Sequence, residues 1–204
     1  MQIKQVTKHV NVIESGAVVL RARATYVAVE GEGYEKFNDC YQKAAEAYLS
    51  WAQNKQGKLL REEYAARKTD RIFGFRPMLC HMDVRVVWQQ ERFWSVVVDS
   101  VRDSGVNGEY PVCHRSADVW DMQRGVIIPI KHFLTHIPAL RGQRVGGKRP
   151  EGLWLDESGV VLYHNAASDG YVEFHTGMHV DFVPKRGGAM QDFVPVLADF
   201  IKKA

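Results

Sequence analysis

The chain has 204 residues, of which 46% are apolar and 25% are charged. These are ordinary values for a globular protein, and the length suits one full-sized domain, so we predict a single domain over residues 1–204. The formal net charge of +3 is too small to indicate a nucleic-acid-binding protein, which would carry a concentrated basic stripe. No run of about 18 apolar residues predicts a membrane span.

The three cysteines bear on the cellular compartment. Cys40, Cys80 and Cys113 are an odd number, lie far apart and have no C-x-x-C spacing, whereas secreted disulfide scaffolds carry an even and denser set. The first ten residues also lack the apolar stretch of a signal peptide. If the chain is complete, we expect a cytoplasmic protein; if it is a trimmed fragment, we expect an extracytoplasmic one.

The N-terminal third predicts a hairpin followed by a long helix. Val10 to Glu14 and Ala17 to Glu30 have the composition of strands, and the turn Ser15-Gly16 joins them. From Tyr34 to Ala52 apolar residues recur every three or four positions, and the pattern resumes through Tyr64. This spacing forms one apolar stripe on a helix. We predict that the helix is the main cover of a sheet.

The rest of the chain predicts consecutive strands joined by short turns. These strands are expected at Met78 to Gln89, Arg92 to Arg102, Tyr110 to Met122, Val126 to Ile130, Gly152 to Leu155, Val160 to His164, Tyr171 to Phe174 and His179 to Val183. A short helix is expected within Lys131 to Leu140. A closing amphipathic helix is expected from the spacing of Met190, Phe193, Val194, Leu197 and Ile201. The pattern favours an α+β fold with mainly antiparallel sheets, covered by the long N-terminal-half helix and a C-terminal helix.

One glycine pattern and two histidine pairs bear on whether the protein binds a cofactor or a metal. Gly31-x-Gly33 stands between a strand and a helix, as in a dinucleotide fingerprint, but the third glycine of that fingerprint is replaced by Lys36. His132 with His136, and His175 with His179, have i,i+4 spacing. No convincing third ligand accompanies either pair, so we predict no metal and no cofactor.

Carboxylates and basic residues give weaker patterns. Asp118 with Asp121, and Asp169 with Glu173, are loose acidic pairs, and Asp118 and Asp121 border a predicted turn, where capping is the expected role. No G-x-S-x-G nucleophile motif or phosphate-binding glycine loop is present. The basic loop Arg141 to Arg149 has no interleaved aromatic residues for base stacking, which favours a solvated loop. We therefore predict no catalytic residue.

The segment from Arg115 to Leu134 resembles a family pattern. Its residues are Arg115-x-Ala117-x-Val119-Trp120-Asp121-Met122-x-x-Gly125-x-x-Ile128-Pro129-Ile130-x-x-Phe133-Leu134. Further pieces fit in the same order, namely Tyr34 to Asn38, Ser104 to Gly108, Gly152 to Tyr163 and Thr176 to Pro184. Over roughly residues 10–184 the chain resembles the domain of unknown function found in the extracytoplasmic part of anti-sigma-V (RsiV-like) factors and beside some peptidoglycan deacetylases.

The resemblance implies an α+β domain with helices packed on an antiparallel sheet. It also implies a binding role, because the anti-sigma-V members bind lysozyme outside the cell and that binding exposes the anti-sigma factor to regulated proteolysis. A lysozyme-like protein or a cell-wall component is the partner that it suggests.

Three hypotheses for the function follow. The first is a non-catalytic binding or sensing domain that uses the loops Ser104 to Tyr110 and Asn165 to Gly177, because aromatic and small residues together suit recognition. Its candidate binding residues are Asn107, Tyr110, Asp169, Tyr171 and Glu173. The second is a cell-wall glycan or peptide hydrolase that uses the late-loop residues Asp169, Glu173, His175 and His179. The third is a structural domain that forms a homodimer through a sheet edge or an aromatic patch.

Overall fold

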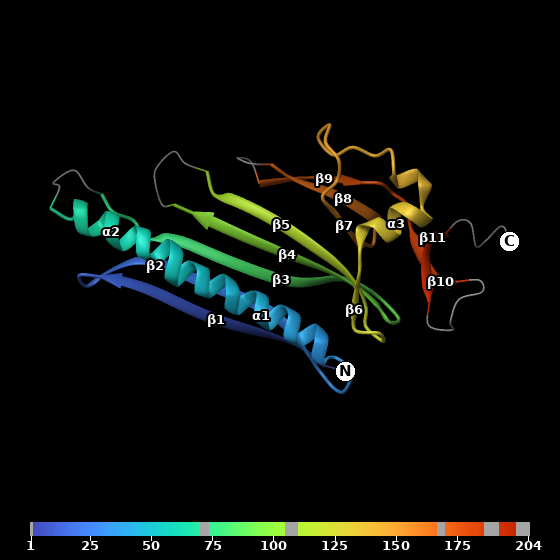
Figure 1. Cartoon of the computed structure of the whole chain (residues 1–204), viewed down its shortest axis with the longest axis horizontal. Helices are drawn as coiled ribbons and strands as arrows, with labels where there is room; N and C mark the ends of the chain where they lie inside the picture. The colour runs from blue at the N-terminus through green and yellow to red at the C-terminus, as the bar shows by residue number, and fades with distance from the viewer. Residues whose placement is uncertain (1, 70–73, 105–109, 167–169, 186–191, 199–204) are drawn as a thin grey trace. The chain divides into compact units, whose positions relative to one another are not determined.

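The chain contains two compact units (Figure 1). The computed structural model describes residues 2–69, 74–104, 110–166, 170–185 and 192–198. The first unit comprises residues 1–85, 98–115 and 167–170, and the second comprises residues 86–97, 116–166 and 171–204. That the whole chain folds as one domain stays a prediction. No helix in the described ranges is long and apolar enough to cross a membrane.

The described strands form three sheets. The six-stranded sheet has the order β1-β2-β3-β4-β5-β6. Its strands are β1 (Gln2–Glu14), β2 (Ala17–Glu30), β3 (Met78–Gln90), β4 (Phe93–Asp103), β5 (Val112–Asp121) and β6 (Val126–Ile128). A three-stranded sheet holds β7 (Gly152–Asp156), β8 (Gly159–Ala166) and β9 (Gly170–His175), and a two-stranded sheet holds β10 (Val180–Pro184) and β11 (Phe193–Leu197).

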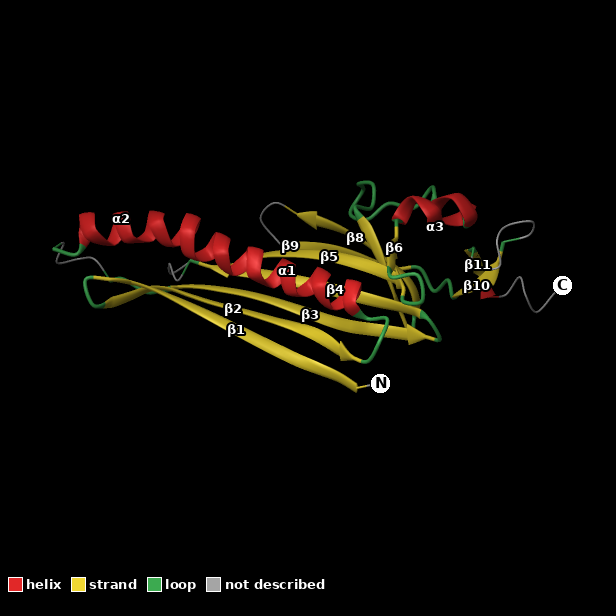
Figure 2. Cartoon of the chain, turned by 60° about the horizontal axis from the view of Figure 1, so that its bottom comes forward, coloured by secondary structure: helices red, strands yellow, loops and turns green. Residues whose placement is uncertain are grey.

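The first unit packs a long helix on one face of the sheet (Figure 2). Helix α1 (Glu35–Trp51) continues through a π-helical turn (Ala52–Gln56) into α2 (Gly57–Arg67). The apolar stripe of α1 is buried at Phe37, Tyr41, Ala45 and Leu49. This confirms the predicted long helix as the cover of a sheet.

Polar side chains fix the helix on the hairpin. Asn38 of α1 accepts a hydrogen bond from the Val29 backbone nitrogen (2.8 Å) and donates one to the Val29 carbonyl (2.9 Å), as a paired strand residue would. Lys8 of β1 reaches Glu46 of α1 at 2.7 Å. The start of the helix is therefore held to β2 by an amide that imitates the backbone.

The strands are antiparallel in the pairs β1-β2 and β5-β6 of the six-stranded sheet, and in the pairs β7-β8 and β10-β11 of the two smaller sheets, as predicted. The exception is β2 with β3, which pair in parallel from Leu20↔Met78 to Thr25↔Asp83. The helices explain this exception. A strand that returns after a helical crossover can run in the same direction as the strand before it, whereas a tight turn must reverse the chain.

The second unit has its own apolar core. Helix α3 (Ile130–His136), predicted as the short helix, and a 3-10 turn (Pro138–Leu140) bury Phe133, Ile137 and Leu140. They pack with residues of β5, β7, β8 and β10, namely Val119, Leu153, Leu155, Val160, Leu162 and Val180. Arg141 from the basic loop donates to the carbonyls of Leu134 (2.6 Å) and Thr135 (2.9 Å). This guanidinium therefore caps the C-terminus of α3.

Two element predictions were wrong. Strand β1 begins at Gln2 rather than Val10, and its alternation is weak in the sequence because β1 is an edge strand with mostly exposed side chains. Over Phe193–Leu197 the structure has strand β11, paired with β10, in place of the predicted closing helix. Pro195 explains the second error, because a helix-interior proline removes a hydrogen bond and clashes with the preceding turn, while an edge strand tolerates it. Met190 and Ile201 lie outside the described residues.

Gly159 should tolerate no side chain. Its φ is +106°, and a Cβ built there would lie 2.5 Å from the Met178 carbonyl oxygen. We expect Gly159→Ala to destabilise the protein by more than about 3 kcal/mol, because a backbone clash is added to left-handed strain of about 1–3 kcal/mol. Gly147→Ala is the matched control, since Gly147 has φ +78° with nothing within 4 Å of the added Cβ. Urea unfolding of both variants is the measurement, and equal losses would contradict the close approach.

Asp99 should make stability depend on pH. Its carboxylate binds Arg115 Nε and Nη2 (2.6 and 2.7 Å) and Arg85 Nη2 (2.6 Å). Burial acts to raise the pKa of Asp99, but the hydrogen bonds and charges of Arg115 and then Arg85 outweigh it, so the pKa is lowered. The stabilisation is therefore present above the unfolded-state pKa and is lost as the pH falls through the lower folded-state value.

We expect Asp99→Asn to cost about 2 kcal/mol or more at pH 7, because Arg115 is buried and loses its counter-charge. The cost should begin to shrink below roughly pH 4, where the carboxylate of the unfolded wild-type chain takes up its proton, and should continue to shrink as the pH falls toward the lower folded-state pKa. Denaturant unfolding at pH 7 and pH 3 measures both effects. Asp39→Asn, whose partner Lys43 is exposed, is the control and should change stability little. An Asp99→Asn cost that is independent of pH would refute the ionic contribution.

Candidate functional site

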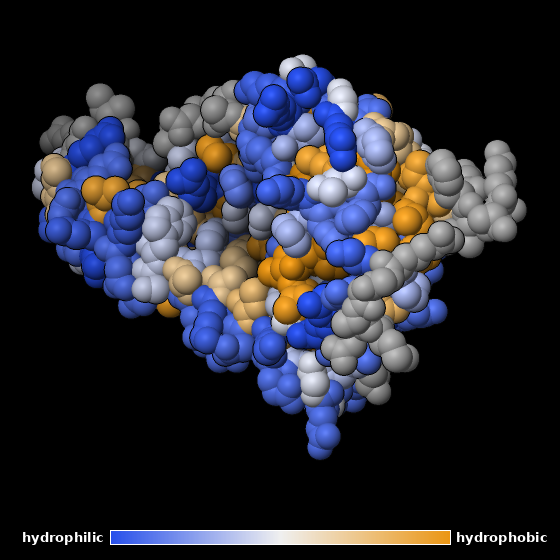
Figure 3. All heavy atoms as spheres, turned by 45° about the vertical axis from the view of Figure 1, so that its right-hand side comes forward, coloured by the Kyte–Doolittle hydropathy of each residue, from blue (hydrophilic) through white to orange (hydrophobic). Residues whose placement is uncertain are grey.

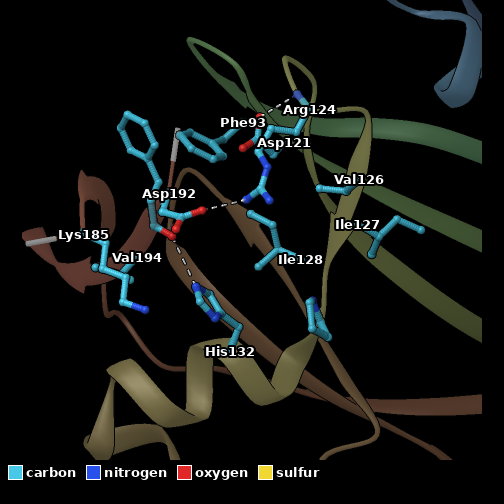
Figure 4. A pocket seen from close by; sticks show the side chains of 12 residues that line it. Phe93, Asp121, Arg124, Val126, Ile127, Ile128, His132, Lys185, Asp192 and Val194 are labelled. Atoms are coloured by element: carbon cyan, nitrogen blue, oxygen red, sulfur yellow. Dashed lines mark hydrogen bonds and ion pairs between the residues drawn. The ribbon is translucent and has the colours of Figure 1, made fainter. Parts of the chain in front are cut away.

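The second unit contains a cavity of about 240 Å³ between β6, α3 and β11 (Figure 4). Apolar side chains also gather at the surface on the side of this unit where β10 and β11 lie (Figure 3). The cavity walls are largely apolar, with five polar or charged side chains between them. The lining residues are Phe93, Asp121, Arg124, Val126, Ile127, Ile128, Pro129, His132, Lys185, Asp192, Phe193 and Val194.

Stacked aromatic rings build one wall. Phe93, at the start of β4, is buried and stacks on Phe182 of β10 with ring centroids 3.8 Å apart. Phe193 of β11 lies 5.6 Å from Phe93. The guanidinium of Arg92 lies over both rings, 4.1 Å from the Phe193 centroid and 5.1 Å from that of Phe93. Cation–π attraction of this kind strengthens when the cation is shielded from water.

Asp121 holds Arg92 in place through a buried ion pair. Its carboxylate is almost fully buried and accepts a hydrogen bond from Arg92 Nη2. The second oxygen accepts from the Arg124 backbone nitrogen at 3.2 Å (Figure 4). Asp121 therefore has the turn role that its position predicted. The same contacts hold the turns on either side of β4 and β5 together, since Met122 N donates to the Arg92 carbonyl at 2.8 Å.

The opposite side of the cavity carries excess positive charge. Arg124 Nη1 lies 3.6 Å from Asp192 Oδ1, so these two charges compensate each other. Lys185 also lines the cavity, and within the described part of the chain no carboxylate forms an ion pair with it. His132 Nε2 lies 3.3 Å from the Phe193 carbonyl oxygen and therefore carries a proton to donate.

The predicted histidine pair of α3 lies on one helix face. The rings of His132 and His136 are 4.6 Å apart and meet edge to face. Burial lowers the pKa of His136, and the charges of His132 and Lys185 lower it further. Protonation of His136, which would add a positive charge, is therefore disfavoured here. Among the described residues, no group of three metal-ligating side chains is found.

The candidate residues from sequence that the structure describes, Tyr110, Tyr171 and Glu173, are not among the residues that line this cavity. Tyr110 is 87% exposed and belongs to the first unit. Tyr171 and Glu173 belong to the second unit, where they lie two residues apart on β9 and so on one face of that strand. Asn107 and Asp169 lie outside the described residues. Whether any of these side chains binds a partner stays a prediction.

Two of the residues proposed for hydrolysis meet in an exposed network. His175 Nε2 lies 3.1 Å from Glu173 Oε1, and His175 Nδ1 lies 3.0 Å from Ser158 Oγ. Ser158 Oγ in turn lies 2.6 Å from Asp156 Oδ1. His179 is elsewhere, in a separate cavity beside Trp88 and Asp181. The order serine, histidine and carboxylate invites comparison with a catalytic triad.

The hydroxyl of Ser158 is directed to a carboxylate in this network. Ser158 Oγ donates to Asp156, and the two nitrogens of His175 lie beside Ser158 and Glu173. A hydroxyl has a single proton, so the proton that Ser158 donates to Asp156 is not donated to His175. The network therefore ties β9 to the β7–β8 turn.

The cavity residues were missed in the sequence for identifiable reasons. Phe193 and Val194 fit the spacing of the predicted closing helix, so the sequence did not show that they lie on strand β11. Arg92 and Asp121 are 29 residues apart, and no local pattern shows that they meet. The one available signal was the apolar run Val126 to Ile130, which has no charged residue.

Comparison with known proteins identifies the fold. No family model matches the sequence, and no curated protein matches it. A solved structure of a DUF3298 family member from Bacteroides fragilis has a TM-score of 0.58 and 12% identity, and a DUF3298 family protein from Pseudomonas aeruginosa PAO1 has a TM-score of 0.52 and 8% identity. Each comparison covers 85% of this chain and 89% of the other. The chain has the fold of these two proteins. At this identity, the likeness concerns the fold alone.

The Arg92–Asp121 pair should be strongly coupled. We expect Arg92→Leu and Asp121→Leu each to destabilise the protein by about 3 kcal/mol or more, because each leaves a shielded charge uncompensated. The double variant should lose roughly 2 kcal/mol less than the sum of the two single losses. Denaturant unfolding of all four proteins measures this coupling. The same cycle on the exposed pair Arg124–Asp192 is the control, with an expected coupling below about 1 kcal/mol, and equal couplings would refute the special role of the buried pair.

Proposed function

We propose that this protein is a non-catalytic binding domain and that the cavity of the second unit receives part of its partner. The observation that carries the proposal is the cavity itself, which has apolar walls and a few fixed polar groups. Binding sites commonly have this composition, in which the apolar surface gives affinity and the polar groups give orientation. Arg92 and Asp121 hold the walls in place before any partner arrives, and such preorganisation lowers the entropic cost of binding.

Binding is favoured over hydrolysis by the network around His175. A hydrolase needs a nucleophile, a base that can accept its proton and a group that orients the base. Ser158 directs its proton to Asp156 rather than to His175, so the base is missing from the set. The cavity, by contrast, presents surface to a partner, and its described lining residues include no serine or cysteine.

A lysozyme-like protein is the first partner to test, because the sequence resembles the anti-sigma-V domain, whose members bind lysozyme. The fold shared with the DUF3298 structures is compatible with this partner but does not identify it. Many lysozymes are strongly basic and this chain has a net charge of +3, so long-range attraction contributes little. Binding would then depend on short-range contacts and would survive moderate salt.

We expect saturable binding when the full chain is titrated with hen-type lysozyme by calorimetry at low and at moderate salt. Val126→Asp should weaken that binding at least tenfold, because it places a charge at the cavity wall. Ile3→Asp is the matched control: Ile3 and Val126 are apolar strand residues with similar exposure, 39% and 38%, but Ile3 lies in the first unit. Tyr110→Ala and Tyr171→Ala test the loop residues.

The outcomes separate the partner from the site. An absence of binding at both salt concentrations removes lysozyme as the partner. Binding that Val126→Asp leaves unchanged moves the site away from the cavity. If Tyr110→Ala or Tyr171→Ala then weakens binding, the loops rather than the cavity form the interface.

A further inference from the structure

Strand β6 ends the six-stranded sheet with an edge open to pairing. In the described residues its ladder partner is β5 alone, through Val119↔Ile128, Trp120↔Ile127 and Asp121↔Val126. An edge of this kind presents backbone N–H and C=O groups that another chain can pair with. Charged side chains usually protect such edges, as Lys4 and Lys8 do on the opposite edge strand β1. The three side chains of β6 are all apolar.

Cavities flank β6 on its two sides. Val126, Ile127 and Ile128 all line the main cavity, with Val126 and Ile128 turned toward its interior and Ile127 turned to the opposite side of the strand (Figure 4). A second cavity of about 140 Å³ shares Ile127, Ile128 and Pro129 with the first. Successive side chains of a strand point to opposite faces of a sheet. A strand added at β6 would therefore direct alternate side chains toward the two cavities, and strand-addition domains gain their specificity from pockets of this kind.

Size and charge restrict what enters the main cavity. Its volume of about 240 Å³ is below the roughly 300–1,000 Å³ of pockets that enclose a whole small molecule. It therefore suits one side chain of a larger ligand. Arg124 is compensated by Asp192, so Lys185 supplies the excess charge. The N–H of His132 already donates to the Phe193 carbonyl. A carboxylate complements the ammonium group of Lys185.

We infer that β6 binds an extended segment of a partner protein, which adds as a further strand, places an apolar side chain in the main cavity and presents a carboxylate to Lys185. The inference rests on the proposed binding function and specifies the chemistry of its partner. The carboxylate belongs either to the C-terminus of the segment or to an acidic side chain. Backbone pairing along β6 is common to both cases.

The test uses the full chain labelled with ¹⁵N and three degenerate pentapeptide libraries. The first library has free C-terminal carboxylates, the second is amidated and lacks acidic residues, and the third is amidated and contains Asp or Glu at one position. We expect the amide signals of Val126, Ile127 and Ile128 to shift with the first or the third library and at least threefold less with the second. Whichever library acts identifies the source of the carboxylate. N-methylation of the peptide backbones should abolish the shifts, because it removes the donors for strand pairing.

Charge variants check the role of Lys185. Lys185→Gln should reduce the preference for carboxylate-bearing peptides at least fivefold, whereas Lys131→Gln, an exposed lysine on α3 outside the cavity lining, should leave it unchanged. Equal shifts with all three libraries, or shifts confined to residues away from β6, would overturn the inference. Lysozyme binding without β6 shifts would refute the inference and move the binding site away from the cavity, while leaving the proposed binding function in place. Carboxylate-dependent shifts of β6 would support the inference even if lysozyme itself did not bind.

Discussion

The second unit depends on one shielded ion pair, Arg92 with Asp121. Arg92 follows β3 and precedes β4, while Asp121 ends β5, so their contact closes two neighbouring turns of the sheet against each other. The guanidinium also lies over Phe193, which brings β11 into the same assembly. A charge pair in such a place stabilises mainly by geometry, because desolvation cancels much of its attraction. The main effect of the pair here is to fix the position of Arg92 over the rings of Phe93 and Phe193.

The aromatic wall of the cavity separates two kinds of surface. On one side, Phe93 of the wall is buried in the core and stacks on Phe182, and on the other side the apolar residues of β6 face an open cavity. Natural sheets usually protect an apolar edge with a charge, a bulge or a covering segment. The apolar edge of β6, beside a lysine without an acidic partner in the described residues, is the feature on which the proposed strand addition rests.

The sequence predicted the elements whose periodicity reflects burial. Strand β2 was placed correctly at Ala17 to Glu30 because its alternate residues are buried, and α1 was placed well because four core positions follow one helical stripe. The C-terminal strand was not predicted because Phe193, Val194 and Leu197 also fit a helical spacing. Pro195 is the one residue there that disfavours a helix. The ladder between β2 and β3 was not predicted, because strand direction depends on the crossover rather than on either strand.

The site was less predictable than the fold. Asp121 was recognised as a turn residue, but its partner Arg92 comes from another turn and Lys185 from the end of β10. Such convergence arises from the tertiary structure, and a single sequence carries no local record of it. His175 and Glu173 were named together from sequence and do meet, but the direction of proton donation that decides their chemistry depends on Ser158 and Asp156.

The parallel ladder between β2 and β3 also affects the order in which the first unit assembles. The β1–β2 hairpin closes across the short turn Ser15-Gly16, so its contacts form between residues close in sequence. Strand β3 can join only after the chain from Gly31 to Pro77 has folded back as a helical crossover, and closing that long loop costs entropy before its contacts compensate. Until then one edge of β2 is unpaired. The nascent chain therefore passes through a stage in which an apolar strand is open to mispairing, and the arrival of the helix determines how long that stage lasts.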